Sequence, residues 1–327
     1  MRPLLVLFLV TALSAGAADD LPVSGPVLGY AWDAGLSRLR PILGIPGSSL
    51  LGAPVDPGLP LALAEVSPSQ DYALGVHGAN GELLVVRFPA LTVGRVAGVG
   101  GVTRIAISPS GSAAAVYSQD IQALWILTGL PDAPLAAQVP LPGAISALAV
   151  NDAGDLALAV APEQLFAQLF ALGPGAEPRL LGPAGAGLLL AFLERSSDAL
   201  IADPARREVT LLRGLAERVV LAGERDGVVD PVAVAAAGRR VLVADRGAAA
   251  VLVVDLGGGP PVRVDCPCGV ASLQRLRGDA VFRVTATFQS ASWLVEAGGE
   301  QPRLWFVPPD PPPARPPRDR SFQERSR

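Results

Sequence analysis

One short turn recurs six times along the chain at a nearly constant spacing, and this repeat limits the possible folds more than any other feature. Each copy lies between two short apolar runs, as in ISPSGSAAA and VNDAGDLAL. Successive turn centres are 41, 43, 43, 41 and 40 residues apart. The turn centres are Gln70, Gly111, Gly154, Ser197, Gly238 and Gly278. Glycine and serine predominate at these positions, which is typical of tight hairpins that need a positive φ or a small side chain.

Each repeat contains four apolar runs of four to seven residues, bounded by turn-forming residues. Runs of this length that are rich in aliphatic and β-branched residues predict strands, because helices need longer uninterrupted windows. The stretch 164–172 also has helical spacing, but it falls where the other copies place their third strand, so we expect a strand there. Four strands in about 40 residues form one blade of a β-propeller. The sequence therefore predicts an all-β fold, a β-propeller of four-stranded blades.

The number of blades follows from the length of the repeated region. Residues 61–308 hold six copies, and residues 18–60 add 43 positions, the length of one more blade. Within that first segment, residues 27–33 resemble a third strand and residues 39–45 a fourth. We predict seven blades with an irregular first blade, and the alternative is six blades with an N-terminal flap. Closure of the ring leaves only short, protected strand edges.

Two of the repeats carry a more specific pattern. Residues 241–255 read VLVADRGAAAVLVVD, and residues 199–212 read ALIADPARREVTLL as a looser copy. Both resemble the NHL and YVTN propeller repeats, whose blades contain a V-x-V-A-D-x-x-x-x-x-V-x-V-x-D run. Asp245 and Asp203 match the Asp of that run, and the resemblance implies that these side chains shape the turn between two strands. The other repeats depart from the motif.

The two ends of the chain differ from the repeats. Residues 1–17 have the pattern of a secretory signal, with Arg2, an apolar run at 4–13 and an Ala15-Gly16-Ala17 cleavage site. A ten-residue apolar run is too short to cross about 30 Å of hydrocarbon, so we expect export to the periplasm or extracellular space without a membrane span. Residues 309–327 include six Pro and five Arg and predict a disordered tail. The propeller is expected over residues 18–308.

Composition argues against several classes of function. The net charge is −4 and the 26 basic residues, all Arg, form no cluster in the repeats, which disfavours nucleic-acid binding. Two Cys and one His argue against zinc fingers and His-based triads. We expect a monomer without a cofactor or metal.

Propellers place ligands at the channel mouth, where the innermost strands begin. Counting back six to eight residues from each turn gives a single carboxylate, Asp230, beside Arg104. Propeller hydrolases of the lactonase type converge several acidic and amide side chains there on a divalent cation, and calcium takes six to eight oxygen ligands. One carboxylate cannot form such a site. Asp230 and Arg104 remain the candidates for an alternative hydrolase or lyase site.

Cys266-Pro267-Cys268 is the one unusual chemical feature of the sequence. Exported thiols tend to be oxidised, and no other Cys is present as a partner, so we predict a tight disulfide that pins the loop before the last blade. Free thiols, a redox pair or a soft-metal site are the alternatives.

The sequence as a whole favours a non-catalytic, exported scaffold that binds a protein, peptide or glycan through its loops or its channel mouth. A hydrolase or lyase that works at the channel is the first alternative. A redox or metal-handling protein that uses Cys266 and Cys268 is the second. Because one fold serves many functions, the repeat by itself does not choose among these hypotheses.

Overall fold

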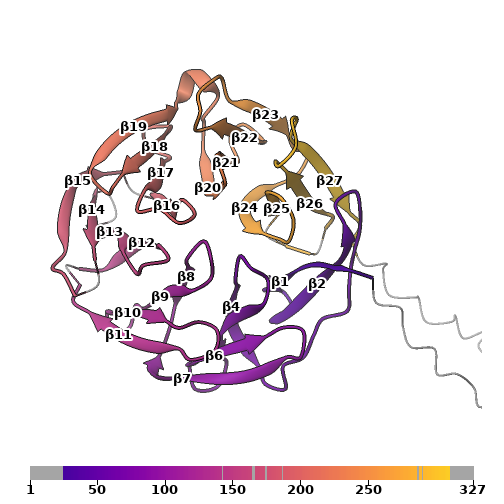
Figure 1. The fold of residues 1–327 in the computed structure, drawn as a ribbon, viewed down its shortest axis with the longest axis vertical. Helices are drawn as coiled ribbons and strands as arrows, with labels where there is room; N and C mark the ends of the chain where they lie inside the picture. The colour runs from indigo at the N-terminus through magenta and orange to yellow at the C-terminus, as the bar shows by residue number, and fades with distance from the viewer. Residues whose placement is uncertain are drawn as a thin grey trace, which may run out of the picture.

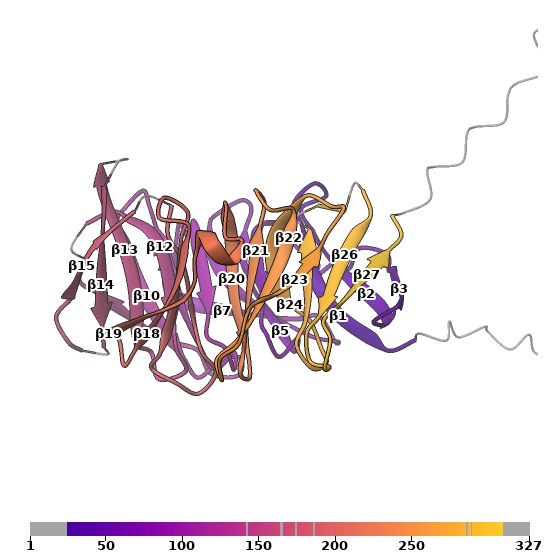
Figure 2. The same cartoon turned by 90° about the horizontal axis from the view of Figure 1, so that it is seen from above.

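Seven antiparallel sheets surround a central axis in the order of the sequence (Figure 1). The computed structural model describes residues 25–309 except 142, 164, 165, 174, 186, 286 and 289. Seen from the side, the ring is a flat disc (Figure 2). We number the sheets as blades 1 to 7. The protein is a seven-bladed β-propeller, as the repeat predicts.

Six of the blades have four strands, which run in chain order from the axis to the rim. Blade 2 comprises β4 (Leu61–Val66), β5 (Tyr72–His77), β6 (Glu82–Arg87) and β7 (Thr92–Gly100). Blade 3 comprises β8 (Arg104–Ile107), β9 (Ala113–Ser118), β10 (Ala123–Thr128) and β11 (Leu135–Val139). Blade 4 comprises β12 (Ile145–Val150), β13 (Leu156–Glu163), β14 (Phe166–Leu172) and β15 (Arg179–Ala184), so the stretch with helical spacing is indeed a third strand.

The remaining four-stranded blades complete the ring. Blade 5 comprises β16 (Leu189–Phe192), β17 (Ala199–Asp203), β18 (Glu208–Arg213) and β19 (Glu217–Ala222). A turn of 3-10 helix, η1 (Glu224–Asp226), leads into blade 6, which comprises β20 (Pro231–Ala237), β21 (Arg240–Asp245), β22 (Ala250–Asp255) and β23 (Val262–Asp265). Blade 7 comprises β24 (Val270–Arg275), β25 (Val281–Thr285), β26 (Ser292–Glu296) and β27 (Arg303–Val307).

The recurring turns join the first strand of a blade to the second. Five of the six predicted turn centres have a positive φ, which ranges from 56° at Gly238 to 108° at Gly278. Blade 5 is the exception, because its residue with a positive φ is Arg195 at 53°, two positions before the predicted Ser197. The glycines therefore occupy the left-handed conformation that favours residues without a Cβ.

The core lies between neighbouring blades, where the second and third strands of one sheet face those of the next. Leu74, Leu83 and Val85 of blade 2, for example, pack in one cluster with Val116 and Leu127 of blade 3. Every residue of β9 is buried, because both faces of this strand are covered. Burial on both faces explains why the sequence shows continuous apolar runs rather than a strict alternation of apolar and polar residues.

Blade 1 is a three-stranded sheet of β1 (Val27–Asp33), β2 (Arg38–Ile45) and β3 (Ser48–Leu51). β1 contacts β4, the innermost strand of the next blade. The second strands of blades 5 and 6 make the same kind of contact, β17 with β20 and β21 with β24. At the rim, β3 lies against the outermost strand β27. The strand missing from blade 1 is therefore the innermost one. The assignment of residues 27–33 and 39–45 as third and fourth strands is wrong by one place, because β3 pairs outside β2 through Ile42 and Leu51.

Side chains from the two neighbouring blades cover the inner edge of β1. The backbone N–H of Tyr30 donates to Oε1 of Gln70 at 2.6 Å, and its carbonyl accepts from Nε2 of Gln274 at 3.0 Å. Gln70 also donates through Nε2 to the carbonyl of Arg275 at 2.6 Å. These glutamines of blades 2 and 7 make the hydrogen bonds that an innermost strand would make. We call this junction of blades 7, 1 and 2 the seam.

The outer part of the seam buries two guanidinium groups against one aromatic ring. The guanidinium carbons of Arg283 and Arg40 lie 3.9 Å and 5.5 Å from the ring centre of Phe288. Nε and Nη2 of Arg283 have no hydrogen-bond partner, and burial lowers the pKa of this side chain to about 10. Arg283 is held by stacking on Phe288 and by the hydrogen bond that its Nη1 donates to Oε1 of Gln274 at 3.3 Å.

The predicted signal at residues 1–17 lies outside the described residues, as does all of the predicted tail except Pro309. Among the described residues we find no helix with the length and hydropathy of a membrane span.

Candidate binding site in the central channel

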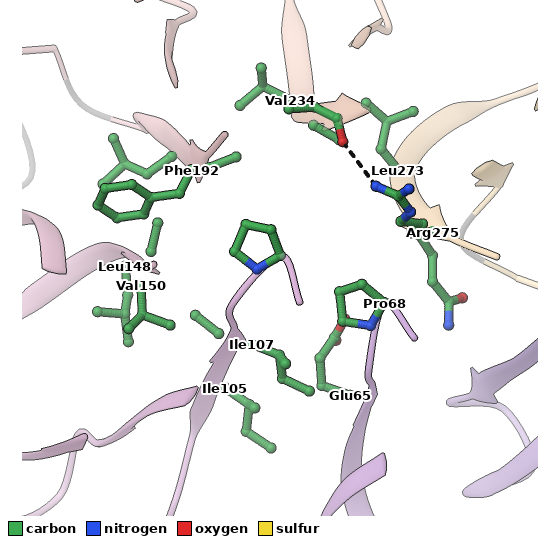
Figure 3. A pocket seen from close by; sticks show the side chains of 18 of the residues that line it. Glu65, Pro68, Ile105, Ile107, Leu148, Val150, Phe192, Val234, Leu273 and Arg275 are labelled. Atoms are coloured by element: carbon green, nitrogen blue, oxygen red, sulfur yellow. Dashed lines mark hydrogen bonds between the residues drawn. The ribbon is translucent and has the colours of Figure 1, made fainter. Parts of the chain in front are cut away.

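The innermost strands of blades 2 to 7 enclose a cavity of 320 Å³ on the axis of the ring. Figure 3 shows the side chains that line it, which are mostly aliphatic. The aliphatic lining comprises Ile105, Ile107, Leu148, Val150, Leu190, Val234 and Leu273, among others. Blade 1 lacks an innermost strand, and among the described residues it contributes none of the lining.

Two charged side chains reach this cavity, Glu65 of β4 and Arg275 of β24. Arg275 forms an ion pair with Glu194 through Nη1. The same nitrogen lies 3.5 Å from the carbonyl oxygen of Ala236, the contact that is dashed in Figure 3. Glu65 has no hydrogen bond or ion pair from its carboxyl group to any described residue. The cavity therefore contains one neutralised cation and one carboxyl group without a partner.

The environment of Glu65 shifts its titration towards neutrality. Its side chain is exposed to the open space of the channel, and the innermost strands of blades 2 to 7 line that space. Removal from bulk water disfavours the charged form and raises the pKa of Glu65 to about 7. The carboxyl group is therefore uncharged in acid and charged above neutral pH.

A second cavity of 290 Å³ opens where the innermost strands end. Its lining, which we call the polar mouth, comprises Pro68, Ser69, Pro109, Ser110, Asp152, Glu194, Arg195 and Arg275. Pro68, Pro109 and Arg275 also line the channel cavity, so the two spaces adjoin.

Hydrogen bonds between blades order one side of the polar mouth. The backbone N–H and the hydroxyl group of Ser110 donate to Oδ1 of Asp152 at 2.9 Å and 2.7 Å. Burial opposes ionisation of Asp152, but hydrogen bonds from Ser110, Ser108 and the backbone of Arg195 together outweigh it and hold the pKa of Asp152 below its usual range. Asp152 is therefore charged at neutral pH.

The structure does not bring the two candidate catalytic residues together. Asp230 immediately precedes β20 in blade 6, and its Oδ2 lies 2.8 Å from Nη2 of Arg246. Arg104 begins β8 in blade 3, three blades away around the ring. In the described part of the chain, no hydrogen bond or ion pair joins the two side chains. Both lie where innermost strands begin, at the opposite end from the polar mouth.

Sequence reasoning missed Glu65, Glu194 and Arg275, three of the charged residues that line the channel and its polar mouth. Counting back from each turn centre stopped at six residues, whereas Glu65 lies five residues before Gln70. Glu194 and Arg275 each lie three residues before a turn centre. Extending the same count towards the turns would have found all three.

The aspartates of the family-like motif hold turns. Asp245 is fully buried, and its carboxylate accepts from the backbone N–H groups of Ala248 at 2.8 Å and Val229 at 2.7 Å. After β17, the carboxylate of Asp203 likewise accepts from a backbone N–H group of its turn, that of Ala205 at 3.0 Å.

Asp33 makes the same kind of turn after β1 by accepting from the N–H of Gly35 at 3.0 Å. In all three turns the fourth residue after the Asp has a φ near 50°, namely Ser37, Arg207 and Ala249. This turn in blade 1 was not anticipated because residues 27–33, which read VLGYAWD, lack the V-x-V-A-D run and were assigned to the wrong strand of the blade.

Cys266 and Cys268 are bonded through sulfur, with their Cα atoms 5.1 Å apart. Cys266 is buried in the cluster between blades 6 and 7. The oxidation state of this pair in solution stays a prediction. Within the described residues, no three His, Cys, Asp or Glu side chains are grouped as a metal site would need.

No protein-family model matches the sequence, and no curated protein is similar enough to match it. Solved structures are similar in fold. One is a protein of unknown function from Desulfotomaculum acetoxidans, at 12% identity and a TM-score of 0.58, with 86% of this chain and 100% of that chain covered. A streptogramin B lyase gives 8% identity and a TM-score of 0.54, with 76% and 84% covered.

A third similar structure is the hydrazine synthase of Kuenenia stuttgartiensis, at 12% identity and a TM-score of 0.53, with 88% of this chain and 98% of that chain covered. At these identities the similarity concerns the fold. Function has to be argued from the channel itself.

Proposed function

We propose that this protein is an exported, non-catalytic binding propeller whose channel takes part of a protein or peptide partner through the polar mouth. The observation that carries this proposal is the pair of adjoining cavities on the axis of the ring, one lined mostly by aliphatic residues and the other mostly by hydroxyl and charged residues. Ligand sites typically combine apolar walls with a few placed polar groups, in volumes of about 300 to 1,000 Å³. A cavity of 320 Å³ suits one or two side chains of a peptide.

The character of the walls favours a peptide over a glycan. Ile105, Leu148 and Leu273 present aliphatic surface, which gains free energy by removing an apolar side chain from water. The polar mouth outside this cavity offers Ser69, Asp152 and the Glu194–Arg275 pair to the backbone of a bound segment.

The proposal is tested by filling the channel. Ala106 of β8 is half-buried and lines the cavity, so Ala106→Trp narrows it. Ala136→Trp, in the exposed rim strand β11, is the matched control. Random peptides displayed against the full-length protein are expected to include binders that keep their affinity for Ala136→Trp and lose about tenfold or more on Ala106→Trp.

Peptides that bind all three proteins equally would place the site elsewhere and overturn the channel proposal. Failure to recover any binding peptide would overturn the binding function itself. Circular dichroism checks that the filled variant is folded. If Ala106→Trp does not fold, Ala191→Trp fills the same cavity from blade 5.

A further inference from the structure

Among the described residues, the Glu65 carboxyl group has no partner in a cavity lined mostly by aliphatic residues. It is the one carboxylate among the described residues that line the channel cavity. Arg275, the cationic residue among the described residues that line this cavity, is engaged by Glu194 and by the carbonyl group of Ala236. An ionised carboxylate in apolar surroundings is costly unless a cation or hydrogen-bond donor meets it. The channel therefore favours a ligand that brings a positive charge.

The position of Glu65 defines the shape of that ligand. Glu65 precedes Pro68 by three residues and lies just inside the polar mouth, beside the aliphatic side chains of Ile105 and Ile107 (Figure 3). A group that reaches Glu65 from the polar mouth passes proline rings and aliphatic walls before it meets the charge. A flexible aliphatic stem with a compact cationic tip fits this sequence of surfaces, and that is the side chain of lysine.

We propose that a lysine side chain of a protein partner enters through the polar mouth and forms an ion pair with Glu65. This inference rests on the proposed binding function and adds the chemistry of the ligand to it. All 26 basic residues of the chain are Arg, so another copy of the protein has no lysine to offer and self-association through this site is disfavoured.

The ion pair makes binding depend on pH. The charged groups that face the path are Arg275, Glu194, Asp152 and Arg195, and the first two neutralise each other. Lysine keeps its charge over the relevant range, whereas the pKa of Glu65 is about 7. The ionised fraction of Glu65 is then about 0.9 at pH 8 and about 0.1 at pH 6. Affinity for lysine should therefore fall about tenfold between pH 8 and pH 6.

The test compares two blocked pentapeptides that differ only at the central residue, lysine in one and norleucine in the other. Norleucine has the same aliphatic stem without the ammonium group. NMR titration of the full chain at pH 8 is expected to show about tenfold tighter binding of the lysine peptide. Glu65→Gln is expected to abolish that difference and the pH dependence. Glu217→Gln, at an exposed position of β19, is the matched control and should preserve both.

Each other outcome overturns a defined part of the reasoning. Equal binding of the two peptides refutes lysine selection and leaves the binding function standing. A lysine preference that persists in Glu65→Gln shows that another group receives the ammonium. Butylammonium binding as tightly as the lysine peptide identifies a small-amine site and refutes the protein source. If neither peptide binds at about 10 mM, the inference fails, and peptide display decides the binding function separately.

Discussion

The closure of the ring depends on Gln70, so Gln70→Ala tests how a blade without an innermost strand is held. The side chain is fully buried, accepts from the N–H of Tyr30 and donates to the carbonyl of Arg275, each at 2.6 Å. Alanine leaves both backbone groups buried without these partners, at a cost of about 1 to 3 kcal/mol each. We expect the free energy of unfolding to fall by about 2 to 6 kcal/mol. Backbone strain is the same in both proteins, because either residue must adopt a φ of 61°.

Equilibrium unfolding in urea measures the loss, and hydrogen exchange of residues 27–33 locates it. The matched control is Gln122→Ala. Gln122 also has a positive φ, 48°, but it is exposed and its amide group makes no hydrogen bond to any described residue. We expect this control to change stability by less than about 0.5 kcal/mol. If Gln70→Ala costs no more than Gln122→Ala, or if the amide of Tyr30 exchanges no faster, Gln70 does not replace the missing strand.

Four further outcomes are expected. Asp245→Ala removes the buried acceptor of three backbone N–H groups, those of Val229, Asp230 and Ala248, and should lower the free energy of unfolding by about 3 kcal/mol or more in urea. Glu194→Gln releases Arg275 in the cavity that contains Glu65, so the pKa of Glu65, followed by carboxyl NMR, should fall; an unchanged pKa would contradict the pairing described above. Because folding raises the pKa of Glu65 from 4.5 to about 7, the folded state binds this proton more tightly than the unfolded chain, and the resulting stability is lost as pH rises through that range. The melting temperature of Glu65→Gln minus that of the wild type should therefore increase as the pH rises from 4 to 8. A difference that stays constant over this range would show that Glu65 titrates normally. Finally, a thiol reagent should find no free thiol in the denatured, unreduced protein and both thiols after reduction; reactive thiols before reduction would rule out the Cys266–Cys268 disulfide.

The sequence predicts the blades well because each blade is a contiguous stretch of chain. Its hydrogen bonds join strands that follow one another, so the apolar runs and the turns at Gly111 or Gly238 contain the information needed to place them. Blade 1 is the exception. Without an innermost strand it has no recurring turn, so the count from turn centres could not fix which strand of the blade residues 27–33 form.

The contacts made by ring closure are beyond local reasoning. Gln70 joins Tyr30, 40 residues away, to Arg275, 205 residues away, and neither partner is evident from the sequence around Gln70. That the carboxyl group of Glu65 has no partner among the described residues has a similar origin. It depends on Arg275 being paired with Glu194, which lies 81 residues from it in sequence and in a different blade. Composition shows that acidic and basic residues nearly balance, but only the fold shows which of them meet.

The seam and the channel are linked through Arg275. Its carbonyl is held by Gln70 at the seam, while its guanidinium group reaches to Glu194 of blade 5. The residue whose carbonyl Gln70 holds at the seam is thus also the cation of the channel cavity, and its guanidinium group is paired with Glu194 rather than with Glu65. Closure of the ring beside blade 1 and the pairing of charges in the channel therefore share one residue, because the carbonyl of Arg275 accepts from Gln70 while its guanidinium group pairs with Glu194.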